Sequence, residues 1–160
     1  MNAVYLETTI PSYLAARPSR DLVVAAHQQI TSEWWSLAPG RFDLFISEAV
    51  LAEIRAGDPE AVARRLEIVE SLPVLPFNDD VRHLARVYEK ALGLPANARV
   101  DVLHIAFASA YELDFLVTWN CAHLANGAVI RRLHGLHEEM KRTTPAIITP
   151  EELIVWPGGD

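Results

Sequence analysis

Short apolar runs alternate with longer segments of helical periodicity along this chain. Between the runs, apolar residues recur every three or four positions, which is typical of amphipathic helices. Strands that alternate with helices favour a parallel sheet covered by helices on both faces. We therefore predict an α/β protein, a three-layer α/β/α sandwich with a parallel sheet of roughly five strands. The predicted strands are residues 3–6, 42–46, 74–75, 115–118 and 147–148.

Capping residues and prolines mark the predicted helix boundaries. Ser47 and Asp58 each precede apolar residues at helical spacing, as do Ser19 or Asp21 and Asn78 or Asp79. Residues 121–134 are predicted to form two short helical pieces, broken near Asn126 and Gly127. The other predicted helices cover residues 11–16, 22–34, 48–56, 59–69, 79–91 and 98–111, with a terminal turn at 150–153. In the 98–111 segment, we expect Val100, Leu103, Phe107 and Ala110 to form the core stripe.

Composition places the chain among globular proteins. Its 160 residues, 51% hydrophobic and 22% charged, are enough for a single domain over residues 1–160 with a substantial core. No apolar run approaches the roughly 20 residues that span a bilayer. The N-terminus lacks the basic and apolar regions of a secretion signal. One cysteine, Cys121, excludes an internal disulfide, so we expect a cytoplasmic protein without membrane contact.

Acidic and amide side chains follow the predicted strands and lie far apart in the sequence. Glu7 follows the first strand, Glu53 lies beyond the second, and Asn120 follows the fourth. Asp101 lies near the start of an otherwise apolar helix. In a parallel sheet, residues just past the carboxyl ends of neighbouring strands converge on one crevice. Carboxylates gathered there repel one another unless a hard cation holds them, which indicates Mg²⁺ or Mn²⁺ and phosphodiester chemistry.

Each of these residues also has a purely structural interpretation. Asp101 is placed to complement a helix dipole, and Glu7 to start a helix with threonine capping. Glu53 at mid-helix is typical of a solvated face, and Asn120 of a turn. Glu48 competes with Glu53, and we assign Glu48 to stabilising the helix dipole.

Other site types find less support in the sequence. His104, Cys121 and His123 lack the repeated spacing that zinc sites favour. There is no glycine-rich phosphate loop and no nucleophile elbow, which argues against nucleotide cofactors and serine hydrolysis. A net charge of −7 is unusual for a protein that holds nucleic acid. Bound cations would offset part of it, and basic residues cluster at 17–20, 64–65, 131–132 and 141–142.

Four motifs in this order resemble the PIN-domain family, in particular the VapC-like toxins of type II toxin–antitoxin pairs. They span nearly the whole chain, to the closing Thr-Pro-Glu-Glu-Leu at 149–153. The motifs are Tyr-Leu-Glu-Thr-Thr at 5–9, Ser-Glu-Ala-Val-Leu-Ala-Glu at 47–53, Asp-Val-Leu-His-Ile-Ala-Phe-Ala at 101–108 and Leu-Val-Thr-Trp-Asn at 116–120.

The resemblance implies a metal-dependent endoribonuclease, usually dimeric and inhibited by a cognate antitoxin. Glu7, Glu53 and Asp101 match the family's metal-site acids, which would hold Mg²⁺ or Mn²⁺ for hydrolysis of RNA. Glu7 replaces the common Asp after the first strand. Asn120 replaces another Asp and removes one charge, leaving it to orient a water or the phosphate. We expect His104 to support Asp101 structurally.

The departure at Asn120 and the acidic balance leave a second interpretation open. The chain would then be a catalytically degraded PIN-fold module that binds RNA or a protein partner without cleavage. A nucleotide-binding α/β domain ranks last, because the phosphate loop is missing.

Overall fold

The structure is a computed structural model that describes residues 1–155. Residues 156–160 lie outside the described part, and the assignment of residues 1–160 to a single domain stays a prediction. Along the chain the elements are β1 (Asn2–Leu6), α1 (Thr9–Ala15), α2 (Leu22–Leu37), β2 (Phe42–Ser47), α3 (Glu48–Ile54), α4 (Pro59–Val69), β3 (Val74–Leu75), α5 (Asp79–Ala91), α6 (Arg99–Ala110), β4 (Phe115–Val117), α7 (Gly127–Met140), β5 (Ala146–Ile148) and α8 (Pro150–Ile154), with short 3-10 helices at Ala38–Gly40 and Ala96–Ala98.

The five strands form one parallel sheet in the order β3-β2-β1-β4-β5. The chain proceeds outward from β1 to β3 and then crosses back to β4 on the other side of β1. Tyr5 of β1 accordingly pairs with Phe45 of β2 on one side and Leu116 of β4 on the other. This reversal of strand order creates a switch point between β1 and β4, where parallel sheets open a crevice at their carboxyl ends.

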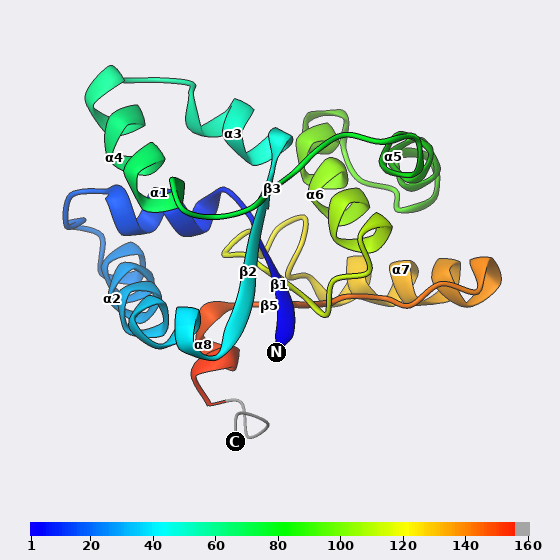
Figure 1. Ribbon diagram of the computed structural model, residues 1–160. Helices are drawn as coiled ribbons and strands as arrows, with labels where there is room; N and C mark the ends of the chain where they lie inside the picture. Colours follow the sequence, from blue (N-terminus) through cyan, green and yellow to red (C-terminus); the bar gives the residue numbers. More distant parts are fainter. Residues whose placement is uncertain (156–160) are drawn as a thin grey trace.

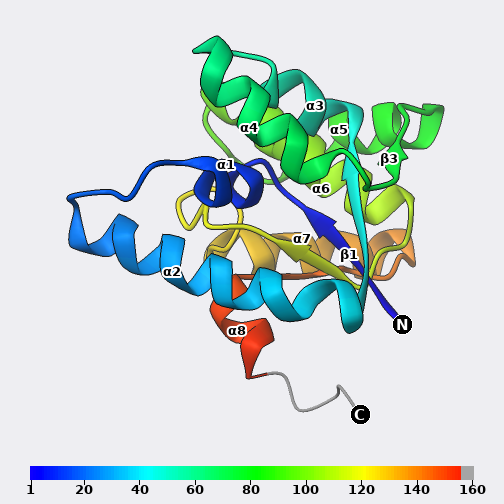
Figure 2. The same cartoon turned by 60° about the vertical axis from the view of Figure 1, so that its left-hand side comes forward.

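Helices cover both faces of the sheet (Figure 1). Helices α1, α2 and α8 lie on one face, and α5, α6 and α7 on the other. Helices α3 and α4 extend beyond the carboxyl end of β2, and α4 packs on α1. The turned view in Figure 2 shows α2 crossing its face of the sheet with α8 packed against it. The predicted three-layer α/β/α sandwich is therefore confirmed.

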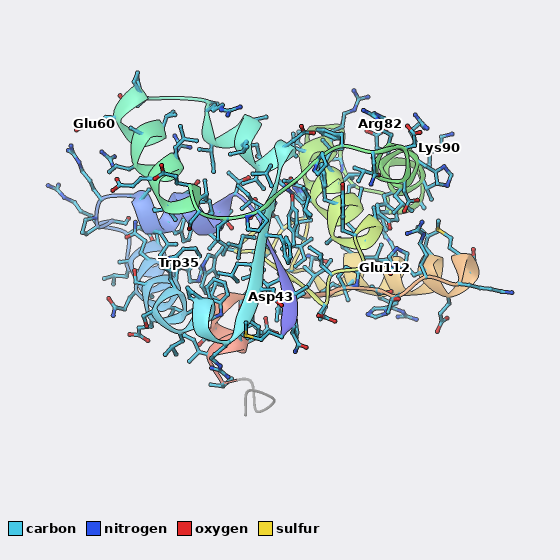
Figure 3. All side chains as sticks on the ribbon, viewed as in Figure 1. Trp35, Asp43, Glu60, Arg82, Lys90 and Glu112 are labelled. Carbon is cyan, nitrogen blue, oxygen red and sulfur yellow. The ribbon has the colours of Figure 1, made fainter. Side chains whose placement is uncertain are left out.

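Many charged residues lie on the outer surface of these helices. Figure 3 places the labelled side chains of Glu60, Arg82 and Lys90 at the periphery, and all three are exposed. Among residues 1–155, no helix combines the length and apolar character that crossing a bilayer demands.

Four of the predicted helix starts are confirmed by side-chain caps. The side chains of Asp21, Ser47, Asp58 and Asn78 each accept hydrogen bonds from backbone N–H groups of the first turn that follows. Such bonds satisfy donors that have no partner within the helix. The cap at Ser47 starts α3 immediately after β2, and so fixes how Glu53 approaches the sheet.

The prediction of two helical pieces over 121–134 is wrong. Residues 121–125 form turns, and α7 is one helix from Gly127 to Met140. The side chain of Asn126 caps α7 by accepting hydrogen bonds from the backbone N–H groups of Ala128 and Val129. The predicted break is therefore the start of a single longer helix.

The predicted core stripe of α6 is also wrong in part. Val100 is 39% exposed, whereas Val102, Ile105 and Ala106 are buried. Because α6 packs against α3, α5 and β4 at once, it is buried around most of its circumference. His104 is drawn fully into the interior by this arrangement. At the start of α2, Leu22 and Val23 are 86% and 64% exposed, so the apolar pattern there does not face the core.

A buried polar contact joins α5 to α7. Tyr88 Oη and His137 Nε2 lie 2.6 Å apart, and His137 Nδ1 lies 2.9 Å from Thr144 Oγ1. Burial lowers the pKa of His137, and the nearby charges of Arg142 and His134 lower it further. The folded protein therefore binds a proton on His137 less readily than the unfolded chain does.

We expect His137 to make the protein less stable in mild acid. As the pH is lowered below the ordinary histidine pKa of about 6.5, the unfolded chain binds this proton before the folded state does. The free energy of unfolding therefore decreases as the pH decreases. Urea unfolding at pH 7.5 and 5.5 should show a smaller loss of unfolding free energy in His137→Gln than in the wild type. This comparison cancels the other titrating groups, and equal losses in the two proteins would contradict it.

Candidate metal centre

The carboxyl ends of β1 and β4 meet at the switch point of the sheet and bring polar residues together. Glu7 directly follows β1, and its backbone N–H donates to Val117 O at 3.1 Å. Thr118, Trp119 and Asn120 directly follow β4. Residues that are more than 100 positions apart in the sequence thus line one crevice, as the parallel topology predicts.

Glu7 is a buried carboxylate with one oxygen fully engaged. Its side chain is 5% exposed. Oε2 accepts hydrogen bonds from Thr9 N at 3.0 Å, Thr9 Oγ1 at 2.5 Å and Thr118 Oγ1 at 2.8 Å. Oε1 instead faces His104, with 3.9 Å between Oε1 and Nε2. The three donors fix the orientation of the carboxylate, so that Oε1 points into the centre.

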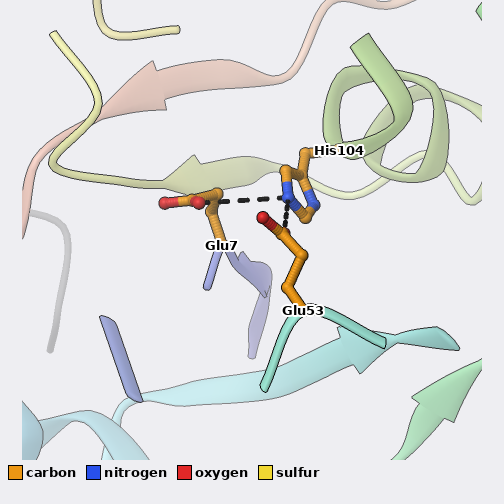
Figure 4. A group of neighbouring side chains, drawn as sticks. All are labelled: Glu7, Glu53 and His104. Carbon is orange, nitrogen blue, oxygen red and sulfur yellow. Dashed lines mark hydrogen bonds and ion pairs between the residues drawn. The ribbon is translucent and has the colours of Figure 1, made fainter. Parts of the chain in front are cut away.

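Glu53 reaches the same place from α3 (Figure 4). Its Oε1 lies 2.6 Å from His104 Nε2 and accepts a hydrogen bond of 2.5 Å from Thr8 Oγ1. Burial by itself would raise the pKa of Glu53. The hydrogen bonds from His104 and Thr8, together with the charge of His104, outweigh burial and hold this pKa below its ordinary value. Glu53 is therefore kept ionised.

His104 is held from behind by a chain of buried hydroxyl groups. Its Nδ1 lies 2.7 Å from Tyr5 Oη, which in turn lies 2.7 Å from Ser47 Oγ. Burial raises the pKa of Tyr5 well above its ordinary value, so its hydroxyl stays protonated. For His104, burial lowers the pKa, but the hydrogen bond to Glu53 and the surrounding carboxylates outweigh it and raise the pKa. Tyr5 thus fixes the imidazole so that Nε2 faces the two glutamates.

Asp101 lies in a second, adjoining group of polar side chains. Its Oδ1 accepts a hydrogen bond of 3.0 Å from Asn120 Nδ2, and its Oδ2 lies 2.8 Å from His123 Nδ1. Asn120 Oδ1 also accepts from the backbone N–H of His123 at 3.0 Å. The backbone N–H of Asn120 donates to Thr118 Oγ1, which itself donates to Glu7. Thr118 therefore links the Asp101 group to the Glu7 group.

Of the four residues predicted from the sequence, two meet directly and two lie next to them. One ligand atom from each of Glu7, Glu53 and His104 falls within 4.8 Å of the other two. Asp101 is outside this group, although its charge is felt by His104. The assignment of Glu7, Glu53, Asp101 and Asn120 as site residues thus stays a prediction.

The structure corrects the role expected of His104. Its hydrogen bonds go to Tyr5 and Glu53, and the histidine that contacts Asp101 is His123. The polar residue in the otherwise apolar α6 was a signal that could have placed His104 in the site. Glu48 lies apart, because its Oε2 accepts a hydrogen bond from the backbone N–H of Phe77.

The donor atoms fit a divalent cation. Carboxylate oxygens are the ligands that Mg²⁺ and Mn²⁺ prefer, and an imidazole nitrogen is accepted more readily by transition ions. Glu7 Oε1 faces the centre, and threonine hydroxyls orient both glutamates. Hydrogen-bond donors that orient the ligand side chains in this way are typical of protein metal sites.

Comparisons with known proteins identify the fold. Neither models of known protein families nor the sequences of curated proteins match this chain. Among solved structures, VapC20 of Mycobacterium tuberculosis, described as a sarcin-ricin loop cleaving toxin, has 16% identity and a TM-score of 0.58, covering 75% of this chain and 92% of its own. A chain of VapBC2 from Rickettsia felis, solved bound to a DNA fragment from their promoter, has 17% identity and a TM-score of 0.57, covering 92% of this chain and 98% of its own.

These similarities agree with the topology and confirm, at the level of the fold, the resemblance drawn from the sequence. TM-scores of 0.58 and 0.57 show that both solved structures share the overall fold of this chain, in which a five-stranded parallel sheet lies between helical layers. The chain therefore has the PIN-like fold of the VapC toxins.

Proposed function

We propose that this chain is a metal-dependent endoribonuclease, the toxin of a toxin–antitoxin pair. The observation that carries this proposal is the gathering of Glu7 and Glu53, with Asp101 beside them, at the switch point of a VapC-like sheet. The similarity to VapC20, described as a toxin that cleaves the sarcin-ricin loop, supports RNA as the substrate.

Glu7, Glu53 and Asp101 would hold one or two Mg²⁺ or Mn²⁺ ions. When bound, such an ion would supply Lewis-acid stabilisation of charge on the phosphate and lower the pKa of a water molecule. Thr9 and Thr118 orient Glu7 through three hydrogen bonds. Asn120 holds Asp101 in place through its amide N–H, and would orient the phosphate or a water with the same side chain.

We propose a cognate antitoxin as a protein partner, and the likeness to VapBC2 supports it. We further propose that the protein is a homodimer that acts on RNA in the cytoplasm. The net charge of −7 implies weak nonspecific affinity for nucleic acid. Specific side chains near the site therefore have to recognise the substrate.

A second candidate function is a PIN-fold module that binds RNA or a protein without cleaving. Asn120 favours this candidate for two reasons. Its amide donates a hydrogen bond to one oxygen of Asp101, and it lacks the negative charge that an acid at this position would supply. A measurement of metal binding distinguishes the two candidate functions, because a module with a degraded centre gains no stability from the ion.

We expect the purified protein, freed of any partner, to cut a mixed RNA pool in Mn²⁺ into discrete fragments. EDTA should abolish cleavage, and Asp101→Ala should slow it about 100-fold or more, since even residues that only support metal ligands contribute about 10–100-fold. Asp43→Ala is the matched control, because Asp43 lies half-exposed at the opposite end of β2. Fragments that persist in EDTA, or equal activity of the two variants, would overturn the proposal.

We also expect Mn²⁺ to raise the melting temperature of the wild type and not that of Glu7→Gln. A ligand selective for the folded state stabilises by about 2.7 kcal/mol at 100 times its dissociation constant. Glu67→Gln makes the same change on the exposed surface of α4 and should keep the response. If Mn²⁺ leaves the wild type unchanged, the non-cleaving module is the better description.

A further inference from the structure

Three aromatic rings form a half-buried cluster beside the metal centre. They are Tyr13 of α1, His27 of α2 and Trp119, the second residue after β4. The centroids of His27 and Trp119 are 3.9 Å apart with 10° between their planes, a close parallel stack. Tyr13 is nearly parallel to both, with its centroid 6.3 Å from His27 and 6.5 Å from Trp119. Figure 2 shows the yellow segment after β4 lying beside α1.

These distances place Tyr13 relative to the stacked pair. Because Tyr13 is almost equally far from both stacked rings, it lies beside the pair and does not cover His27. Trp119 is 8% exposed and forms the buried side of the stack. His27 and Tyr13 are each partly exposed, so the accessible part of the cluster belongs to the imidazole and the phenol and not to the indole.

The stack is fixed rigidly to the metal centre. The backbone N–H of Trp119 donates to Thr9 Oγ1 at 2.9 Å, and the same hydroxyl donates to Glu7 Oε2. The indole Nε1–H of Trp119 donates to Thr31 Oγ1 at 2.7 Å. Two hydrogen bonds in sequence therefore join the backbone of Trp119, whose ring stacks on His27, to the proposed metal ligand Glu7.

Basic side chains flank this surface although the chain as a whole is acidic. Arg17 and Arg20 are exposed on the segment between α1 and α2, and the Arg17 side chain is 82% exposed. Arg64 of α4 donates to Ala15 O at the end of α1. Arg17 and Arg64 both pair with Glu60, at 3.8 and 3.9 Å, whereas Arg20 has no such carboxylate partner among the ion pairs of residues 1–155. Stacking rings beside positive charge are the combination by which proteins hold unpaired nucleotides.

We propose that His27 and Tyr13, supported by Trp119, bind an unpaired RNA base next to the scissile phosphodiester. This inference rests on the proposed ribonuclease function and names the form of its substrate: a single strand, a loop, or a base turned out of a helix. The base stacks on the outer face of His27, beside the ring of Tyr13. The phosphate that follows it is thereby directed toward Glu7, and Arg17 and Arg20 lie along the backbone. A base paired within a duplex cannot enter this stack.

The test measures binding without cleavage. A short, fluorescently labelled single-stranded RNA is titrated with the full chain in EDTA, and anisotropy gives the dissociation constant. His27→Leu and Tyr13→Leu remove the aromatic ring at similar bulk and should weaken binding about ten- to hundredfold, as loss of one stacked base does. His27→Phe and Tyr13→Phe keep the ring and should bind like the wild type, and the same sequence as a duplex should bind more weakly.

Thermal unfolding of every variant shows whether it is folded, and either leucine variant is sufficient if the other fails to fold. Folded leucine variants that bind single-stranded RNA like the wild type would overturn the inference, and so would a wild type that prefers the duplex. Loss of binding in these variants would support it even if the wild type never cleaves RNA. In that case the proposed function fails while the base-binding stack remains.

Discussion

The rest of the structure is organised around a carboxylate, Glu7, that is buried where the carboxyl ends of β1 and β4 meet. Removing an ionised side chain from water costs on the order of several kcal/mol unless it is paired and hydrogen-bonded. Three donors from Thr9 and Thr118 meet one oxygen of Glu7, and His104 faces the other. To provide them, the segments after β1 and β4 must meet, and α6 must turn a histidine into the interior. The topology of the sheet and the chemistry of the centre are thus satisfied by the same contacts.

Most of the fold could be predicted from local patterns, because strands, caps and amphipathic helices leave periodic signals. The exceptions arise where tertiary packing overrides that signal. Helix α6 is enclosed by three elements, so a core stripe on one side of the helix, beginning at Val100, does not describe its burial. At the start of α2, Leu22 and Val23 keep helical spacing but face solvent. The sequence predicts a break near Asn126, but the side chain of Asn126 caps the start of the single helix α7.

The sequence indicates which acids the structure brings to this edge of the sheet, but not the hydrogen bonds that they make. Strand ends identify Glu7 and Asn120, since topology alone brings them to one edge. His104 forms hydrogen bonds with Glu53, 51 residues away in the sequence, and with Tyr5, 99 residues away. Helix spacing had instead indicated Asp101 as its partner. Such long-range hydrogen bonds depend on how helices are placed over the sheet, which no local pattern encodes.

The hydrogen bonds of Tyr5 also affect the register in which β1 pairs with its neighbouring strands. Val4, Tyr5 and Leu6 are all fully buried, so β1 is apolar on both faces and a slip by one residue would keep hydrophobic side chains inside. That slip would place Leu6 where Tyr5 belongs, leaving buried His104 and Ser47 without their hydroxyl partner. Polar groups of the centre therefore supply the specificity that burial alone cannot give to β1. In this protein, the residues that build the site also select one strand pairing among several that would be equally hydrophobic.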